Sequence, residues 1–581
     1  MKRTTIMLLL AAALMLAPMA ISTARELSPQ STQAYLFGVI NDKGQHDDDE
    51  WQQGVRATTL ELHWFLYEPQ EGVYDMAYVT RMRQRLQLLK AQGWIVQLIP
   101  GVQYVPSWVF ETYPHMRYVN QYGDAYTPET GSFNVINAPF NPQARALVAR
   151  YLQRVFQDFN PADFDSVRVG GSVQGELRYP PPAWNGHNNS YWAFDVYAQD
   201  PAISGIPADV VGWRPGLDAN PGSEGRGQRI VNPGFETLHE RFAIPAWAVD
   251  YDVQALLLTT GAHRGLRALE AAFSGTGRVR QYVPVAPDTT YEFSAWMRTM
   301  DPENAARVYL TQITADNKGV AGVPYGQLES NHPDWAYDEG SLRTSTDTRY
   351  LKVELAGQRP GVFHFDALRL VAEGAPDESH RDLDIPLAFY DWYVAQLSAY
   401  QQWQIDVIRQ YYDGQLDLVY PGKGLLANQV IDALSNDLRG DGWAETSSAL
   451  TSATVYGWHV DSVEETSGLA LYLTGIEEPP PELVNDRSPY PNRWSAARWM
   501  AYLAQENGMP VWGENGGQND ATEMALVLRR MHENGFLGIM WAFESELYAD
   551  PHGGYATMDD YGRLIAVYNS PLRAFLPLTR R

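Results

Sequence analysis

The order of strand-like and helix-like segments constrains the fold of this chain most. From residue 34 onward, apolar runs typical of strands alternate with amphipathic runs typical of helices. Three consecutive examples are TTLELHW at residues 58–64, VTRMRQRLQLLKAQG at 79–93 and IVQLIPG at 95–101. Such alternation indicates a parallel sheet, which is either open or closed into a barrel.

This alternation is interrupted once. NPGSEGRGQ at residues 220–228 forms a Gly-rich connector, and residues 228–374 contain short alternating strands separated by Pro, Asn and Gly turns. That pattern predicts an all-β sandwich of the jelly-roll type. Because the α/β pattern resumes afterwards, we predict that the sandwich is inserted into a domain made of residues 34–225 and 383–575.

Eight strand-like segments remain outside the predicted insertion. They are LFGVI, TTLELHW, IVQLIPG, SVRVGG, LDLVYPG, ATVYGWHV, PVWGE and LGIMWAF. Eight is the number of strands in a closed (β/α)8 barrel, the TIM barrel, which is the fold that we predict. An open doubly wound sheet is the alternative, but NDKGQHDDDE after the first segment is not a Gly-rich phosphate loop.

The first 24 residues have the features of an export signal. Lys2 and Arg3 precede an apolar run at residues 6–17, and Ser22-Thr23-Ala24 offers small residues for cleavage. We therefore expect a secreted or periplasmic protein. The apolar run is too short to span a bilayer, and no later segment is typical of a transmembrane helix. The sequence gives no indication of the oligomeric state.

The composition limits the partners and cofactors. A net charge of −25 argues against nucleic acid and anionic membranes as partners. The chain has no cysteine, no HExxH motif and no GxSxG motif, and HDDDE at residues 46–50 lacks the spacing of a calcium loop. We expect no metal and no cofactor.

In a TIM barrel, the carboxyl ends of the strands form the active site. Here those ends carry acids, amides and aromatic residues that suit sugar rings and their hydroxyls. The candidate substrate-binding residues are Glu61, His63, Trp64, Gln103, Trp108, Gln174, Arg178, Tyr179, Tyr420, Trp458, His459, Trp512, Asn515 and Trp541. We expect a carbohydrate substrate.

Two glutamates among these strand ends suit glycoside cleavage. That reaction needs one carboxylic acid that donates a proton and one ionised carboxylate that attacks the sugar or activates water. Glu176 follows the fourth segment and Glu514 ends the seventh, which predicts this catalytic pair. Glu544 and Glu546 compete for the second role. Taken alone, a glutamate at a strand end is more often a surface or ion-paired group, and Glu176 beside Arg178 fits that description too.

Parts of the barrel sequence resemble two families of glycoside hydrolases. Residues 54–75 and 104–124 resemble the N-terminal barrel region of family-42 β-galactosidases, and GELRYP at 175–180 is similar to the acid-bearing motif of family-14 β-amylases. Either resemblance implies a barrel glycoside hydrolase with Glu176 as general acid and Glu514 as its partner. Gly175 stands where family-42 enzymes carry Asn, and the aspartate-bearing loop of β-amylases is absent after the third segment. The sugar and the stereochemistry stay open.

The inserted segment resembles CenC-like carbohydrate-binding modules. The resemblance rests on RIVNPGFET at residues 229–237, YVPVAPDTTYEFSAWMR at 282–298 and HFDALRLV at 364–371. It implies a sugar platform, for which Trp247, Trp296 and Trp335 are candidates, although a tryptophan within a strand equally suits a core position.

The leading hypothesis is therefore a secreted glycoside hydrolase. A catalytically silent glycan-binding protein on the same barrel is the first alternative, because Asn is missing before Glu176. A surface scaffold whose sandwich docks proteins is the second alternative.

Overall fold

The computed structural model describes most of the chain between residues 34 and 570. It leaves out 41–43, 129–132, 219–226, 237–243, 245, 251, 316, 376–383, 423, 425–451, 482–483, 489–493 and 550–553. The predicted export signal at residues 1–24 lies outside the described residues.

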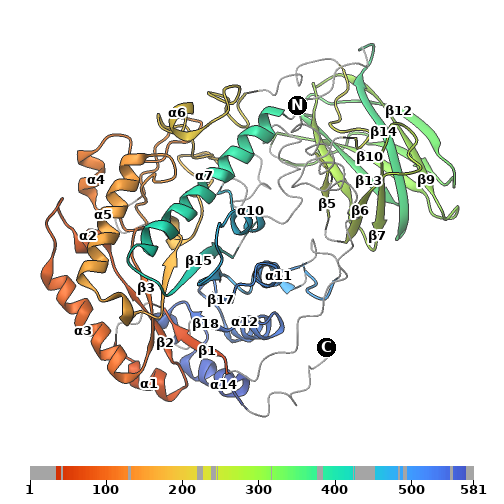
Figure 1. Ribbon diagram of the computed structural model, residues 1–581. Coiled ribbons are helices and arrows are strands. Elements are labelled where there is room, and N and C mark those ends of the chain that lie inside the picture. The colour runs from red at the N-terminus through yellow and green to blue at the C-terminus, as the bar shows by residue number, and fades with distance from the viewer. Residues whose placement is uncertain are drawn as a thin grey trace, which may run out of the picture.

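Eight parallel strands close into a barrel, in the order β1-β18-β17-β16-β15-β4-β3-β2 (Figure 1). They are β1 (Leu36–Val39), β2 (Ala57–Glu61), β3 (Ile95–Ile99), β4 (Ser166–Val169), β15 (Gln415–Pro421), β16 (Leu469–Thr474), β17 (Val511–Glu514) and β18 (Gly538–Trp541). Their residues are almost all buried, as expected for parallel strands covered by helices. The predicted (β/α)8 barrel is confirmed.

Helices surround the barrel. The longer ones are α3 (Met76–Gln92), α5 (Pro142–Asp158), α7 (Asp384–Arg409), α11 (Ala496–Glu506), α12 (Ala521–Glu533) and α14 (Met558–Tyr568). Short helices follow several strands: α1 (Asp47–Gln52), α2 (Trp64–Tyr67), α4 (Ser107–Thr112), α6 (Pro201–Ser204), α10 (Tyr456–Asp461) and α13 (Glu544–Leu547). The ends are set by local chemistry, as in α3, where Asp75 caps two backbone amides and Gly93 ends the helix at φ 87°.

The predicted sixth strand is wrong. ATVYGWHV contains helix α10 instead, and the sixth strand is LALYLT, β16, which pairs with β15 and β17. Valine and tyrosine favour a strand locally, but here the segment forms a helix that packs against α7. LALYLT has the continuous apolar character of a strand buried on both faces.

The inserted sandwich lies beside the barrel in Figure 1 and has two five-stranded antiparallel sheets. One has the order β11-β10-β13-β8-β5 and the other β12-β9-β14-β7-β6. The strands are β5 (Ala248–Val249), β6 (Val253–Leu258), β7 (Ala268–Phe273), β8 (Val279–Pro284), β9 (Thr290–Thr299), β10 (Ala306–Ile313), β11 (Gly326–Ser330), β12 (Ala336–Arg343), β13 (Tyr350–Gly357) and β14 (Gly361–Ala372). Apolar side chains from both sheets form a core of their own, separate from that of the barrel. The predicted all-β sandwich is confirmed.

Among the described residues, no helix has the length and apolar character needed to cross a membrane.

Candidate active site

A tight glycine loop positions Glu176 after strand β4. Gly171 and Gly175 have φ angles of 63° and 76°, which glycine adopts without steric strain. Gly170 approaches so closely that a Cβ atom there would lie 2.3 Å from the carbonyl oxygen of Gly175. The amide of Gly171 donates to that same carbonyl at 3.3 Å, which closes the loop. The sequence GGSVQGE therefore folds back on itself and presents the acid at the strand end.

Glu176 is buried and held by two side chains. Thr474 Oγ1 donates to its Oε1, and Arg178 Nη1 donates to its Oε2 at 3.2 Å. The next residue, Leu177, donates its amide to the carbonyl of Val419 at 2.8 Å, which ties the loop to β15. Burial raises the pKa of Glu176, and this effect outweighs the opposing influence of Arg178 and Thr474. Burial therefore favours the protonated form of this carboxyl group.

Glu514 is the last residue of β17 and has a different environment. Its Oε2 accepts hydrogen bonds from Arg168 Nη2 at 2.6 Å and from the Tyr472 hydroxyl at 2.8 Å. The Arg168 and Glu514 side chains are only 8% and 12% exposed, so their charges pair in a largely dry setting.

The two glutamates meet through strand β16. Thr474, which bonds Glu176, is the direct partner of Glu514 across the β16–β17 ladder. Neighbouring strands lie about 4.8 Å apart, so Thr474 is next to Glu514. The negative charge of Glu514 also contributes to the raised pKa of Glu176. Both carboxylates thus lie at the same end of the barrel, as the sequence predicted, while their catalytic roles stay a prediction.

A third acid, Glu61 at the end of β2, lies near the pair. The Tyr104 hydroxyl donates to Glu61 Oε1 at 2.8 Å, and the Tyr104 ring stacks on His63 with 4.2 Å between ring centres. Burial raises the pKa of Glu61, and the charge of Glu514 adds to the effect. Glu61 and His63 are therefore brought to the site.

Two predicted amides flank the acid loop. Gln103 is buried, and its Nε2 lies 3.4 Å from the position that a Cβ of residue 175 would take. Gln174 is exposed and accepts a hydrogen bond from Arg178 at 3.3 Å. Both side chains lie beside Glu176, and Arg178 links Gln174 to it.

Most of the aromatic residues predicted to bind the substrate lie in the hydrophobic core. Trp64, Tyr179, Tyr420 and Trp541 are at most 1% exposed, and Trp108 is 8% exposed. Four of the five make a side-chain hydrogen bond inside the protein. For example, the Tyr420 hydroxyl donates to Gln401 of α7, and the Tyr179 hydroxyl donates to the carbonyl of Tyr393. Trp541 packs against Tyr561 of α14, on the outer side of the barrel wall. The structure does not support substrate contact for these five residues.

The last four candidates are placed by the fold as follows. Because ATVYGWHV contains a helix, Trp458 and His459 are not at a strand end; His459 is buried between Ser398 and the carbonyl of Ala453. Asn515 exchanges hydrogen bonds with the backbone of Ala542 and so joins the ends of β17 and β18. Trp512 packs inside the barrel with an apolar cluster.

The competing acids after β18 are tied to other parts of the chain. Glu546 Oε2 accepts the amide of Gln518 at 2.7 Å, and burial raises the pKa of Glu546. Glu544 begins α13 and donates its amide to the carbonyl of Ile40 at 3.0 Å. Neither contact involves Glu176 or Glu514.

The sequence did not predict Arg168, Tyr472 or Thr474. Tyr472 and Thr474 lie on the strand that was misassigned, and Arg168 lies within a strand, whereas the prediction considered only strand ends. The one signal available was an arginine in the otherwise apolar run SVRV, where a charge needs a buried partner.

Within the part of the chain that the structure describes, no group of three or more His, Asp or Glu residues is arranged to hold a metal ion.

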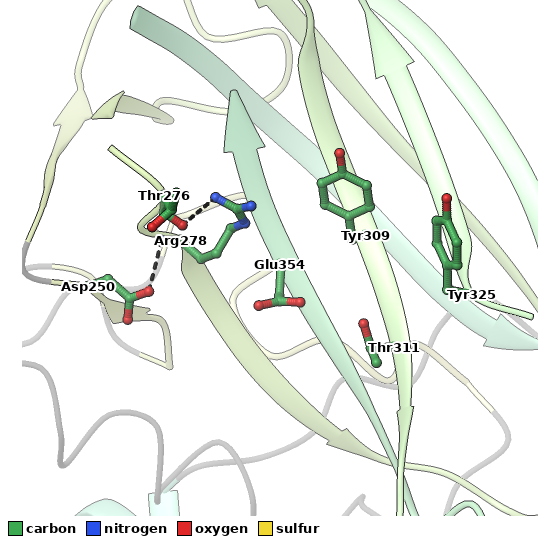
Figure 2. A pocket seen from close by; sticks show the side chains of 7 residues that line it. All are labelled: Asp250, Thr276, Arg278, Tyr309, Thr311, Tyr325 and Glu354. Atoms are coloured by element: carbon green, nitrogen blue, oxygen red, sulfur yellow. Dashed lines mark hydrogen bonds between the residues drawn. The ribbon is translucent and has the colours of Figure 1, made fainter. Parts of the chain in front are cut away.

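A pocket on the sandwich forms a second candidate site. It has a volume of about 470 Å³ and is lined by Asp250, Thr276, Arg278, Tyr309, Thr311, Tyr325 and Glu354. Figure 2 shows the two tyrosines on one side, Arg278 with Asp250 and Thr276 on the other, and Glu354 and Thr311 between them. The sequence analysis did not predict any of these seven residues.

The three predicted platform tryptophans lie elsewhere on the sandwich. Trp247 is fully buried, and its Nε1 donates to the carbonyl of Asn232, so it belongs to the core. Trp296 and Trp335 belong to the other sheet or its margin, where His263 stacks on Trp296 at 3.5 Å and Arg298 lies 4.8 Å from the Trp335 ring. One face of each of these two rings is therefore already covered.

Comparison with known proteins supports a glycosidase. Residues 50–160 match the family model of glycoside hydrolase family 42, described as β-galactosidase. This segment includes β2, β3 and α5 but neither Glu176 nor Glu514. With the closed barrel, it supports a hydrolase that acts on O-glycosyl bonds, and the predicted resemblance to glycoside hydrolase barrels is confirmed.

Several solved structures are similar to this chain. The catalytic domain of β-amylase from Paenibacillus polymyxa is 12% identical, with 92% of this chain and 99% of that chain covered and a TM-score of 0.46. TmCBM61 in complex with β-1,4-galactotriose is 20% identical, with 25% and 99% covered and a TM-score of 0.20. A family 22 carbohydrate-binding module of Clostridium thermocellum Xyn10B is 14% identical, with 25% and 94% covered and a TM-score of 0.20. No curated protein matches the sequence.

Proposed function

We propose that this protein is an exported enzyme that hydrolyses glycosidic bonds with Glu176 as general acid and Glu514 as the second carboxylate. One observation carries the proposal: Glu176 bonds Thr474, whose ladder partner is Glu514. Export rests on the signal-like residues 1–24.

The two environments suit the two roles. Glu176 has a raised pKa and so retains a proton that it can give to the leaving oxygen as the glycosidic bond breaks. Glu514 faces the Arg168 cation and so supplies the negative charge that attacks the anomeric carbon or removes a proton from water. If Glu514 attacks the sugar, Glu176 gives its proton to the departing alcohol and regains one from the water that hydrolyses the glycosyl intermediate. If Glu514 instead removes a proton from water, Glu176 ends ionised and Glu514 ends protonated, and proton exchange with solvent restores both groups.

β-Galactosides are the first substrates to test, because the family model that matches residues 50–160 is described as β-galactosidase. The anomer released first, observed by NMR, distinguishes retention from inversion.

Neutral substitutions of the two acids test the proposal. We expect Glu176→Gln and Glu514→Gln each to lower kcat by about 10²–10⁴-fold on a glycoside that the parent hydrolyses, because each removes a charge or proton essential to the reaction. Glu546→Gln is the matched control and should retain activity. Circular dichroism should show that all three variants are folded.

Full activity in either variant of the pair would refute the assignment. Binding of a glycan by the parent without hydrolysis of any glycoside in a broad panel would favour the silent glycan-binding protein, for which Gly175 in place of Asn is the supporting observation.

We also propose that the sandwich binds carbohydrate, in the pocket of Tyr309 and Tyr325 rather than at the predicted tryptophans. Tyrosine faces stack on sugar rings, and the pocket adds carboxylate, hydroxyl and guanidinium groups that can bind sugar hydroxyls. The resemblance of residues 228–374 to carbohydrate-binding modules supports the same function.

Retention in a gel that contains polysaccharide tests this second proposal. Tyr325 is 62% exposed, so Tyr325→Ala should leave the fold intact but reduce retention by about fivefold, since a stacked ring contributes roughly 1 kcal/mol. Tyr337 on the other sheet is 49% exposed and provides the control Tyr337→Ala. Equal retention of the two variants would exclude this pocket as the carbohydrate-binding site.

A further inference from the structure

The interior of the barrel contains a buried polar chain beneath the active site. Barrels of this type are normally filled by branched apolar side chains. Here Gln97 of β3, Arg168 of β4 and Asp417 of β15 are each at most 9% exposed. These three residues, together with Tyr472 of β16, occupy neighbouring strands of one wall.

The hydrogen bonds between these buried polar side chains run in one direction, from Arg168 to Gln97 and from Gln97 to Asp417. Gln97 Nε2 donates to Asp417 Oδ2 at 2.6 Å, and Arg168 Nε donates to Gln97 Oε1 at 2.6 Å. Because the Arg168 guanidinium only donates, the Gln97 oxygen has to face Arg168, and the Gln97 amide nitrogen then faces Asp417. Asp417 therefore fixes Gln97, and Gln97 fixes the guanidinium of Arg168.

The other end of the guanidinium reaches Glu514. Arg168 Nη2 donates to Glu514 Oε2 at 2.6 Å and to the Tyr472 hydroxyl at 2.6 Å, and the guanidinium also lies 4.3 Å from the Tyr472 ring centre. Burial acts to lower the pKa of Arg168, but the charges of Glu514 and its neighbours raise it overall, so the group stays a cation. A buried cation of this kind needs its partner, because either charge left alone is strongly destabilising.

Both side-chain hydrogen bonds to the Glu514 carboxylate fall on one oxygen. Arg168 and Tyr472 both bond Oε2, and no hydrogen bond from the described residues reaches Oε1. Two donors on one oxygen hold the carboxylate in a fixed orientation and leave the other oxygen available for chemistry.

We infer that Arg168, held by Gln97 and Asp417, is a positioning residue that orients the Glu514 carboxylate so that Oε1 is the oxygen that reacts. This inference rests on the proposed function, since it assigns how one of the two catalytic carboxylates is held. A purely structural role for Arg168 is the competing explanation, and it predicts loss of stability without a specific loss of turnover.

Removal of the guanidinium separates the two explanations. We expect Arg168→Ala to lower kcat by about 10²–10³-fold while KM changes by less than about threefold, because a misplaced reactive oxygen affects the chemical step rather than ground-state binding. Guanidinium ion added at millimolar concentration should raise the kcat of Arg168→Ala by at least about tenfold, since it can fill the vacated space and donate to Glu514 Oε2 again. Urea has the same planar shape without the charge and should not restore activity.

A matched arginine controls for a general response. Arg145 of α5 is half-buried and donates to the carbonyls of Ala138 and Pro139, outside the site. Arg145→Ala should retain kcat and show no rescue. Gln97→Met should lower kcat in the same direction as Arg168→Ala but less, because Arg168 keeps its contact with Glu514. Parental kcat in Arg168→Ala, parental kcat in Gln97→Met, or equal rescue by urea and guanidinium would overturn the inference.

Melting temperatures give a test that does not need turnover. Arg168→Met and Glu514→Gln each leave one buried group without its partner, whereas the double variant removes both. We expect the double variant to lose clearly less than the sum of the two single losses, and additive losses would overturn the inference. If the parent hydrolyses no glycoside, the proposed function fails, while this comparison still shows whether Arg168 and Glu514 act as a unit.

Discussion

Glu176 combines a buried carboxyl group with a raised pKa, and this combination has an effect on stability. The folded state holds the proton of this group more tightly than the unfolded state does. The stability that it contributes is therefore complete below the ordinary pKa of a glutamate and is lost as the pH rises through the raised value.

A glutamine at position 176 cannot ionise and should remove this loss. We expect Glu176→Gln to melt about 1–3 °C higher than the parent at pH 8 and at about the same temperature near pH 4. Glu111 is exposed on α4, so Glu111→Gln should match the parent at both pH values. An equal melting temperature of Glu176→Gln and parent at pH 8 would contradict the raised pKa.

At the scale of single residues, the sequence predicted the positions of the acidic residues better than those of the aromatic residues. Glu61, Glu176 and Glu514 lie at the predicted end of the barrel, because a carboxylate that ends an apolar strand is easily recognised and a barrel brings such ends together. Trp64 and Tyr179 were assigned to the substrate because they come at the ends of predicted strands. In the fold, their polar atoms find partners inside the protein, Glu68 for Trp64 and the Tyr393 carbonyl for Tyr179.

At the scale of elements, the loop after β4 depends on glycine more than on any side-chain contact. A Cβ atom at residue 170 would lie 2.3 Å from the Gly175 carbonyl oxygen and would force the loop open. We expect Gly170→Ala to lower kcat/KM by about 10–100-fold, because displacement of Glu176 by about 1 Å misaligns proton donation.

Gly319 of the sandwich gives the control for this substitution, because a Cβ atom there has no neighbour within 4 Å. Gly319→Ala should leave the kinetics on a short soluble glycoside unchanged. A Gly170→Ala variant with parental kcat/KM would show that the loop tolerates opening.

The strands show where local sequence is not sufficient. Seven of the eight predicted segments overlap a barrel strand, whereas the sixth does not. ATVYGWHV and LALYLT both have residues that favour strands, and the choice between them depends on which one can pair with β15 and β17. Tertiary contacts make that choice, and no local pattern contains them. Because the strand LALYLT was not predicted, its residues Tyr472 and Thr474 were not predicted as parts of the site either.

At the scale of the whole molecule, the change of pattern near residues 220 and 383 was informative because helix-rich and helix-free segments differ in period. The division into two architectures follows from that change, and the count of eight strand-like segments predicted the closed barrel. The sandwich pocket could not be predicted in this way, because its tyrosines, acids and arginine come from separate strands and loops with no shared motif.

The pairing of β4 with β15 has a consequence for biosynthesis. Residues 166–169 hydrogen-bond to residues 415–418, and the entire sandwich is encoded between them. While the ribosome makes the sandwich, at roughly 5–20 residues per second, the nascent half-barrel has an open edge at β4 that can pair with other chains. That edge of β4 can be covered by its own partner only after residues 415–418 of β15 have been synthesised.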